Sequence, residues 1–433
     1  MRQGRNTAGS SHMPTISTDL PPFDIERQAT IIAGEPGPRR PSQKDETAKP
    51  GLGRPLMGIG VRRVDGTTAR FGTDIFLHRR SRPVRFSEVK TTPEHRAGCC
   101  IYGGVIGPGF GHLLTQSTGR LWLCDLFPDA PVLFVSSRRG LTQVPEYFEQ
   151  ALRQLGIRNP VELICQSVQV EKLVVGEEQC NLHRRPSVLP YFSAWLRTHR
   201  PARPLEAGLR LYVSRAKLSL ANGQFLQETV LEEFLQQQGY RVIHPETMSI
   251  DAQMSAFGSA EKLVFADGSA VHLWSLIARP DQHAAMILRR PLDSHIARWF
   301  QGLPDVTLDY LDARMADFSR LGGPSNTSVA LLDMQALCAE LRRLGFIATN
   351  DAIGPPRVLL ETWLARMERG RSPLRSAPLA LDERSRQLIL RRRGAKPSAA
   401  DAPSSEENCG DSMSSTAEEP QRPQTGDPAK HAP

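Results

Sequence analysis

The sequence predicts an α/β protein with two lobes and disordered ends. Short apolar, β-rich segments alternate with helical patterns between about residues 97 and 175, and again from Leu209 to Arg290. Such alternation is typical of βα units that build a mostly parallel sheet. The Pro-rich stretch Arg200–Pro204 separates the two series and indicates a linker. Two α/β lobes joined by a linker form a cleft, and such clefts are preferred ligand sites.

Both ends of the chain differ in composition from the middle. The first 55 residues are rich in Pro, Ser, Thr and Gly without apolar periodicity, and the chain after Arg369 is basic and then Ser-, Glu- and Pro-rich. Such segments cannot bury enough apolar surface to offset the entropy of ordering them. We predict disordered tails over 1–55 and 369–433, an N-terminal lobe over 56–204, and a C-terminal lobe with added helices over 205–368.

The N-terminal lobe opens with an ill-defined, strand-rich region from Met57 to Val89. Clearer elements follow, because short apolar runs bounded by Gly or Pro indicate strands and a period near 3.6 indicates helices. The expected strands are Ala97–Val105, Pro131–Val135, Val161–Ile164 and Glu171–Val175, and the expected helices are His112–Trp122, Pro145–Leu155 and Pro186–Arg200.

The C-terminal lobe alternates more regularly. Gly239 and Gly345 each follow a helical pattern, as is common at helix C-termini. The expected strands are Arg210–Arg215, Tyr240–Glu246, Glu261–Ala266 and, as the last one, Ala284–Leu288; the expected helices are Phe225–Gln238, one before Glu261, one after Asp267–Ala270, Leu331–Leu344 and Arg357–Met367.

The chain is basic, with a formal net charge of +8, and only eight of its 54 basic residues are lysine. A basic balance suits nucleic acid, an anionic membrane surface or anionic substrates. The arginines are spread along the chain without a zinc finger, RNP motif or basic zipper, so we do not expect nucleic acid as a partner. The Arg391–Arg393 cluster lies in a predicted tail; contact with the inner face of a membrane is one interpretation and a solvated tail the simpler one.

Cysteine usage and apolar patterning indicate a cytoplasmic protein, peripheral to the membrane at most. The seven cysteines form no CxxC pair, which favours free thiols in a reducing compartment. No run of eighteen apolar residues indicates a membrane span, and the first residues lack the apolar core of a signal peptide. Neither HExxH nor DxD occurs, and His272, His283 and His295 are widely spaced, so we expect no bound metal and no cofactor.

Charged and small residues follow three successive strands of the C-terminal series. Ligands of open α/β sheets bind at the carboxyl ends of strands, where Arg215, Glu246 and the Asp267–Ala270 loop are expected to meet. An arginine fork, with Lys217 nearby, suits a diphosphate, and a Gly-Ser turn before a helix offers free amides to an anion. This pattern indicates a phosphate-bearing ligand with a sugar-like polar part. The plainer alternatives are a surface ion pair for Arg215 and helix or turn caps for the others.

A second glycine-rich loop, Gly107–Gly111, precedes His112 in the N-terminal series. It matches neither GxGxxG nor a Walker loop, which speaks against a dinucleotide-dependent enzyme. His112 at the mouth of a helix is a candidate general base, and a capping or packing histidine is the plainer interpretation.

Taken in order, these segments resemble glycosyltransferase family 61 from about Ala97 to Arg290. The matching residues are Gly111–Leu114 and Arg120–Trp122 in the first half, then Tyr212–Arg215, Glu228, Gly239–Tyr240, Pro245–Glu246, Gln253, Ala260 and Gly268–Ala270. The chain departs from the pattern at Asp267–Ala270, where many members carry His-Gly-Ala-Gly, and at Gln227, where an Asn is common.

The resemblance implies a GT-B fold, in which two Rossmann-like lobes face a cleft. It also implies inverting, metal-independent transfer of a sugar from a nucleotide-sugar donor to a glycan or polysaccharide acceptor, as in bacterial capsule or lipopolysaccharide assembly. The C-terminal lobe would bind the donor and the N-terminal lobe the acceptor. The residues that we expect to bind substrate are Arg215, Lys217, Glu228, Glu246, Gly268, Ser269 and His272; His112 is the first candidate for the general base and Asp267 the second.

One alternative of another class stays open. The Asp267 substitution is also compatible with a degenerate, non-catalytic protein that binds a nucleotide sugar as a scaffold in polysaccharide assembly. Slow hydrolysis of the donor separates the two interpretations, because a pure binder leaves its nucleotide sugar intact.

Overall fold

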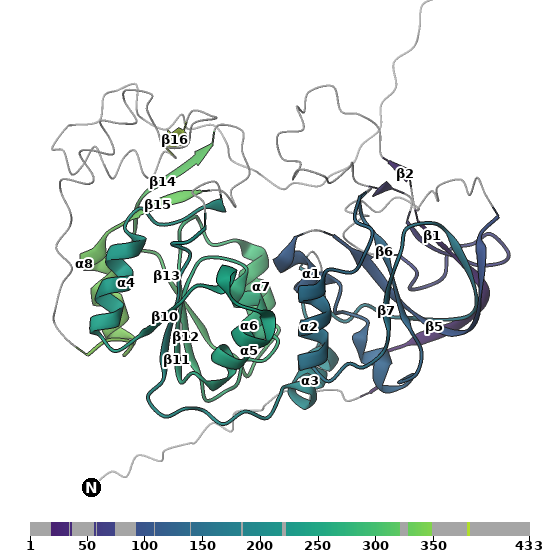
Figure 1. Cartoon of the computed structure of the whole chain (residues 1–433), viewed down its shortest axis with the longest axis horizontal. Coiled ribbons are helices and arrows are strands. Elements are labelled where there is room, and N and C mark those ends of the chain that lie inside the picture. Colours follow the sequence, from purple (N-terminus) through teal and green to yellow (C-terminus); the bar gives the residue numbers. More distant parts are fainter. Residues whose placement is uncertain are drawn as a thin grey trace, which may run out of the picture. The chain divides into compact units, whose positions relative to one another are not determined.

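The computed structural model describes residues 19–33, 35–36, 56–57, 59–73, 92–107, 109–138, 140–182, 185–218, 222–320, 328–348 and 379–381. Within these ranges the chain forms two large β-sheets with helices packed on them, which confirms the α/β class (Figure 1). Both large sheets belong to one compact unit. Two small antiparallel sheets pair β2 (Glu35–Pro36) with β3 (Leu56–Met57), and β14 (Arg314–Arg320) with β15 (Val329–Leu332) and β16 (Leu379–Leu381).

The first large sheet is mixed, with the strand order β4-β1-β8-β5-β6-β7. Its strands are β1 (Phe23–Ile32), β4 (Gly60–Arg62), β5 (Glu94–Ile106), β6 (Val132–Ser136), β7 (Val161–Ile164) and β8 (Val168–Gly176). β8, β5, β6 and β7 are parallel neighbours, as the alternation predicted, whereas β1 is antiparallel to both β8 and β4. The antiparallel strands come from the part of the sequence that showed no clear pattern.

The predicted N-terminal tail is wrong for residues 23–32, because they form β1 inside this sheet. Ala29 and Ile31 are fully buried in an apolar cluster on the sheet. The polar residues Glu26–Gln28 interrupt the strand, and Gln28 has a positive φ of 54°, which breaks the period-2 alternation that identifies a strand. The strand β16 likewise falls inside the predicted C-terminal tail.

The helices of the first half are α1 (Phe110–Gln116), α2 (Glu146–Gln154) and α3 (Pro190–His199). The helix predicted over His112–Trp122 begins two residues earlier and ends at Gln116; the 3₁₀ segment η1 (Leu121–Asp125) follows it. Between α1 and η1 the chain passes close to the segment that follows β8. A Cβ on Gly119 would stand 2.6 Å from the carbonyl oxygen of Cys180 in that segment.

The second large sheet is fully parallel, with the order β10-β9-β11-β12-β13. Its strands are β9 (Arg210–Val213), β10 (Arg241–Ile243), β11 (Lys262–Ala266), β12 (His283–Ile287) and β13 (Leu308–Leu311). After β9 the chain adds β10 on one side, and then it adds β11, β12 and β13 on the other side. This reversal of strand order marks the usual ligand site of a doubly wound sheet.

Helices cover both faces of the second sheet (Figure 1). One face packs on α4 (Glu228–Gln237) and α8 (Met334–Arg343), and the other on α5 (Ile250–Ser259), α6 (Ala270–Ser275) and α7 (Ser294–Gln301). Two predicted boundaries are wrong. β12 is not the last strand of the sheet, since β13 extends it. The helix predicted over Leu331–Leu344 is instead the end of β15 followed by α8. The N-cap of α8 is Asp333, whose side chain accepts a hydrogen bond from the Ala336 amide. The predicted helix Arg357–Met367 lies outside the described residues.

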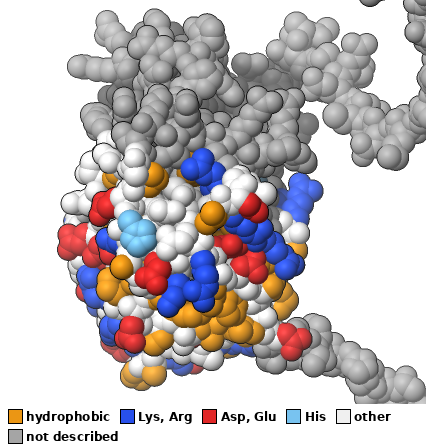
Figure 2. Space-filling model, turned by 90° about the vertical axis from the view of Figure 1, so that its right-hand side faces the viewer, with side chains coloured by type: hydrophobic (Ala, Val, Ile, Leu, Met, Phe, Trp, Pro, Cys, Tyr) orange, Lys and Arg blue, Asp and Glu red, His pale blue; other side chains and the backbone are white. Residues whose placement is uncertain are grey.

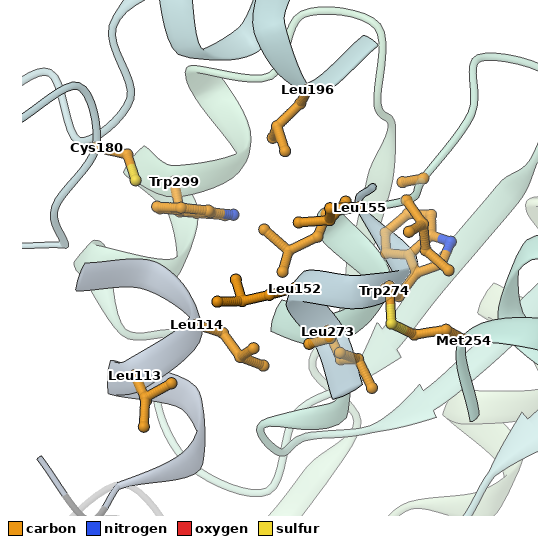
Figure 3. Packing of buried hydrophobic residues seen from close by; sticks show 14 of the residues in the cluster. Leu113, Leu114, Leu152, Leu155, Cys180, Leu196, Met254, Leu273, Trp274 and Trp299 are labelled. Atoms are coloured by element: carbon orange, nitrogen blue, oxygen red, sulfur yellow. The ribbon is translucent and has the colours of Figure 1, made fainter. Parts of the chain in front are cut away.

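The two sheets share one hydrophobic core. Helix α1 packs against α6, and α2 packs against α5. Leu114 and Leu152 from the first half meet Leu273 and Trp274 from the second, all of them fully buried (Figure 3). A continuous core fixes the helices of one sheet against those of the other. The division into lobes over 56–204 and 205–368 therefore remains a prediction.

The surface and the helices carry two further observations. On the face seen in Figure 2, basic side chains are intermingled with acidic ones, and hydrophobic side chains gather along its lower part. The positive charge is thus not collected into a single patch on this face. Among the described helices, none combines the length and the apolar character needed to cross a bilayer.

Candidate active site

A pocket of about 330 Å³ opens at the carboxyl ends of β9 and β11, where the strand order of the second sheet reverses. It contains the ends of three predicted strands and part of α1. The lining residues are Val213, Ser214, Arg215 and Leu218 after β9, Pro245 and Glu246 after β10, Gln253 on α5, Ala266, Gly268, Ser269 and Ala270 after β11, and Phe110 on α1. The sheet topology therefore brings Arg215, Glu246 and the Gly268–Ser269 turn together, as the sequence predicted.

The guanidinium of Arg215 is held in a fixed orientation at this pocket. Its Nε donates to the carbonyl of Gly223 at 3.1 Å, and its Nη2 donates to the carbonyl of Asn222 at 2.6 Å. Burial lowers the pKa of Arg215, while the charges of Asp267, Glu228 and Glu246 act in the opposite direction. An arginine stays cationic under these conditions, so the pocket presents an oriented, poorly hydrated positive charge.

Gly268 is glycine because the guanidinium lies against it. A Cβ on Gly268 would stand 3.1 Å from Arg215 Cζ and would overlap Arg215 Nη1. The Nη1 edge of the guanidinium therefore faces the Gly268–Ser269 turn, at the start of the short helix α6. A cation, a bare stretch of backbone and a hydroxyl meet at this point of the pocket.

Glu246 and Gln253 also line the pocket. Glu246 lies on the 3₁₀ turn η3 (Pro245–Thr247) with its side chain exposed at the pocket. Gln253 donates from Nε2 to the carbonyls of Pro245 at 2.8 Å and Met248 at 3.1 Å, which holds that turn in place. Gln253 belongs to the family motif but was not predicted at the site; a polar residue seven positions after Pro-Glu was the available signal.

Phe110 is the other lining residue that sequence reasoning missed. It is the first residue of α1, half-buried, and its ring lies 5.2 Å from that of Tyr147 on α2, centroid to centroid. The first half of the chain thus contributes an aromatic wall to a pocket built by the second half. The aromatic residue inside the Gly107–Gly111 loop was the only signal in the sequence.

Asp267, the second candidate for the general base, does not line the pocket. Its side chain is buried, and Oδ2 accepts from Arg290 Nε at 3.1 Å. Its carbonyl accepts from Arg289 Nε at 3.0 Å, and Oδ1 has no hydrogen-bond partner among the described residues. The carboxylate of Asp267 therefore forms a buried ion pair with Arg290.

Three other predicted substrate contacts are absent from the pocket wall. Lys217 is exposed beside it, and the next residue, Leu218, lines the pocket instead. Glu228 is buried below the loop that carries Arg215. His272 is buried on α6, where Gly111 of α1 passes so closely that a Cβ there would stand 3.0 Å from His272 Cδ2.

His112, the first candidate for the base, lies on the exposed side of α1, two residues from Phe110. Its Nδ1 is 3.2 Å from Nε2 of Gln116, one helical turn later. His112 does not line the pocket itself, but it is close enough to influence the charge state of His272. That His112 reaches a bound substrate is part of the proposed function.

The buried imidazole of His272 should make the protein sensitive to acid. Burial, followed by the nearby charge of His112, lowers its pKa from 6.5 to about 4. The unfolded chain then binds the proton more readily than the folded one, so stability is full above pH 6.5 and falls as the pH drops toward 4. Between pH 7 and pH 5 we expect this group to remove about 2 kcal/mol of unfolding free energy. In urea titrations at both pH values, His272→Gln should lose less stability than the wild type; equal losses would contradict the assignment.

The described residues contain no group of three or more His, Cys, Asp or Glu side chains arranged to hold a metal ion. The chemistry of the pocket wall is instead that of an anion site with an apolar side. Arg215, Gly268 and Ser269 supply a cation, open backbone and a hydroxyl. Apolar surface comes from Phe110, Leu218, Pro245 and Ala270.

Comparison with known proteins places this pocket within one family segment. Residues 110–283 match the family model described as Glycosyltransferase 61, which is less than half of the chain. All the lining residues named above fall within that segment. No curated protein matches the chain. The match supports the family that the order of motifs predicted, and a glycosyltransferase requires a sugar donor and an acceptor.

Proposed function

We propose, on the premise of the glycosyltransferase 61 match, that the protein transfers a sugar from a nucleotide-sugar donor bound in the pocket at the ends of β9 and β11. The observation that carries the proposal is the Arg215 guanidinium, oriented by two carbonyls and turned toward the Gly268–Ser269 turn. When the bond from the anomeric carbon to the diphosphate breaks, negative charge develops on the leaving oxygen. A preoriented cation in a partly water-excluded pocket stabilises that charge without reorganising.

The remaining walls suit the rest of the donor. Glu246 is an exposed carboxylate at the rim and can accept hydrogen bonds from sugar hydroxyls. The apolar face of a sugar or base suits Phe110, Leu218 and Pro245. A polar end for phosphates and an apolar side with a few polar groups is the usual composition of a small-molecule site.

The acceptor is proposed to approach from the side of α1, with His112 as the general base. The acceptor hydroxyl attacks the anomeric carbon, its proton passes to the imidazole, and the nucleoside diphosphate leaves with the bonding electron pair. His112→Ala is expected to lower kcat by about 10²–10⁴-fold while leaving donor affinity within twofold of the wild type. Steady-state kinetics with both substrates varied tests this; a variant that loses only donor affinity would remove His112 from the role of base.

Finer features of the proposal come from the family resemblance. They are inverting stereochemistry, independence from metal ions, transfer of a hexose or pentose, a GT-B arrangement of two lobes, and a place in bacterial capsule or lipopolysaccharide assembly. A cytoplasmic location, peripheral to the membrane at most, is also proposed, on the cysteine usage and the apolar patterning of the sequence. Determining the anomeric configuration of the product by NMR would test the first of these directly.

Donor hydrolysis is the first experiment, because it needs no acceptor. The full chain is incubated with a panel of UDP-, GDP- and ADP-sugars, while thermal shift reports binding and chromatography reports released nucleotide. A transferase should be stabilised by one donor class and release its nucleotide slowly. Stabilisation without release would favour the non-catalytic scaffold, and no stabilisation by any nucleotide sugar would contradict both functions.

A further inference from the structure

We infer that Glu228 is a positioning residue that holds the Arg215 loop in the shape required for binding a diphosphate. The inference rests on the proposed function, since it concerns how the same site is built. It replaces the expectation that Glu228 touches the substrate, because this side chain is 3% exposed and lies behind the loop, away from the pocket wall.

The carboxylate of Glu228 holds the loop at both ends. One oxygen, Oε1, accepts from the Arg215 amide at 2.9 Å and from the Tyr212 hydroxyl at 2.8 Å. The other oxygen, Oε2, accepts from the Phe225 amide at 3.2 Å. The described stretches 214–218, after β9, and 222–227, before α4, are thus both fastened to a single side chain.

The loop is closed a second time by the side chain that it presents. Arg215 binds the carbonyls of Asn222 and Gly223, and Gln224 donates from Nε2 to the Arg215 carbonyl at 3.1 Å. Gly223 has a φ of +76°, and a Cβ there would stand 2.6 Å from the Ser328 carbonyl. Two of the three guanidinium nitrogens are occupied within the loop, which leaves the Nη1 edge facing Gly268.

The chemistry of Glu228 suits this role. Its two oxygens accept from four donors, the amides of Arg215 and Phe225 and the hydroxyls of Tyr212 and Ser214, whereas an amide would place one NH₂ group against an N–H. Burial raises the pKa of Glu228, and the hydrogen bonds from Arg215, Tyr212 and Phe225 oppose that shift. The carboxylate of Glu228 therefore accepts hydrogen bonds from several N–H and O–H groups of the loop. Replacing it should shift the Arg215 guanidinium and so weaken diphosphate binding.

The test is a double-mutant cycle that uses inorganic pyrophosphate as the probe. Affinity is measured by calorimetry for the full chain, for Glu228→Gln, for Arg215→Ala and for the double variant. We expect Glu228→Gln to weaken pyrophosphate binding about tenfold and to add nothing further in the Arg215→Ala background, because it acts through that side chain. Glu233→Gln, an exposed carboxylate on the same helix, is the matched control and should bind like the wild type.

Each outcome distinguishes the inference from the proposed function. Unchanged affinity in Arg215→Ala removes the diphosphate site itself and with it the proposed function. A loss in Arg215→Ala with wild-type affinity in Glu228→Gln, or losses that multiply in the double variant, overturns the positioning role alone. If Glu228→Gln does not fold, Tyr212→Phe removes one donor from the same carboxylate; it should weaken binding severalfold only while Arg215 is present, and unchanged affinity would overturn the inference.

Discussion

Arg215→Ala is expected to lower kcat/KM for sugar transfer by about 10²–10³-fold, the usual cost of removing one preoriented charge-stabilising donor. The side chain meets the pocket with one guanidinium edge while the other two nitrogens bind Asn222 and Gly223. Alanine removes the cation and also releases the loop that it closes. The kinetics should be measured with the donor that the hydrolysis screen identifies, and circular dichroism should show an unchanged fold.

Two companion variants make the Arg215 result specific. Arg215→Lys keeps the charge but cannot bind two carbonyls and present a third nitrogen, so its activity should lie between those of wild type and alanine. Arg241→Ala removes an exposed arginine from the neighbouring strand β10 and should be fully active. Full activity in Arg215→Ala, or an equal loss in Arg241→Ala, would contradict the assignment of the leaving-group charge to Arg215.

The regular part of the fold could be predicted from the sequence because each βα unit in the second half is locally marked. Strands β9, β10 and β11 are short, mostly apolar runs, and each is followed at once by a polar residue: Ser214, His244 or Asp267. The rule that ligands bind at the carboxyl ends of strands then placed Arg215, Glu246 and Gly268 in one pocket.

What the sequence could not show is which way a polar residue faces after its strand ends. Asp267 turns into the protein to pair with Arg290, while Gly268 and Ser269, the next two residues, line the pocket. Glu228 similarly matches the family pattern, but its side chain is buried behind the loop that carries Arg215. Neighbouring residues of one turn thus point in different directions, and the direction decides between a substrate contact and an internal ion pair. It depends on tertiary packing, which a local sequence pattern does not contain.

The strands missed by the sequence analysis have weak patterns for physical reasons. In the edge strand β13, Leu308 and Leu311 are buried while the two residues between them are half-buried, which is neither alternation nor a continuous apolar run. Strand β1 owes its place to pairing with β8 over most of its length. Both strands form because they pair with a strand that is distant in sequence. The periodicity of a segment shows only which of its faces is apolar, not whether such a partner exists.

The shared core adds a constraint that the two-lobe prediction lacked. Phe110 lies on α1 of the first half, and Arg215 lies against Gly268, just before α6 of the second. Leu114 of α1 and Leu273 of α6 belong to one buried apolar cluster. The aromatic wall and the cation are therefore held at a fixed spacing by buried side chains. In this structure the pocket is formed without any further closing of one half on the other.

Gly268→Ala should displace the Arg215 guanidinium without removing any charge, which makes it the sharpest test of the guanidinium's position. The added Cβ would overlap Arg215 Nη1 and approach Cζ to 3.1 Å, so the guanidinium has to move out of its place at the turn. Because Asn222 and Gly223 hold the other nitrogens, that movement also strains the loop. We expect a loss of kcat/KM of about 10²-fold, close to that of Arg215→Ala, with weaker pyrophosphate binding.

Gly258→Ala is the matched control for this substitution. Gly258 lies on α5, and a Cβ there would make only ordinary contacts, 3.4 Å to Arg203 Cδ and 3.8 Å to Ile277 Cδ1. Alanine in a helix should stabilise the protein by about 0.5–1 kcal/mol and leave kinetics unchanged. If Gly268→Ala were as active as Gly258→Ala, the guanidinium could not lie against residue 268 in the working enzyme. Gly268→Ala can also be made in the Arg215→Ala background. A steric effect exerted through Arg215 has to vanish once that side chain is gone, so an undiminished loss there would contradict the proposed contact between Gly268 and Arg215.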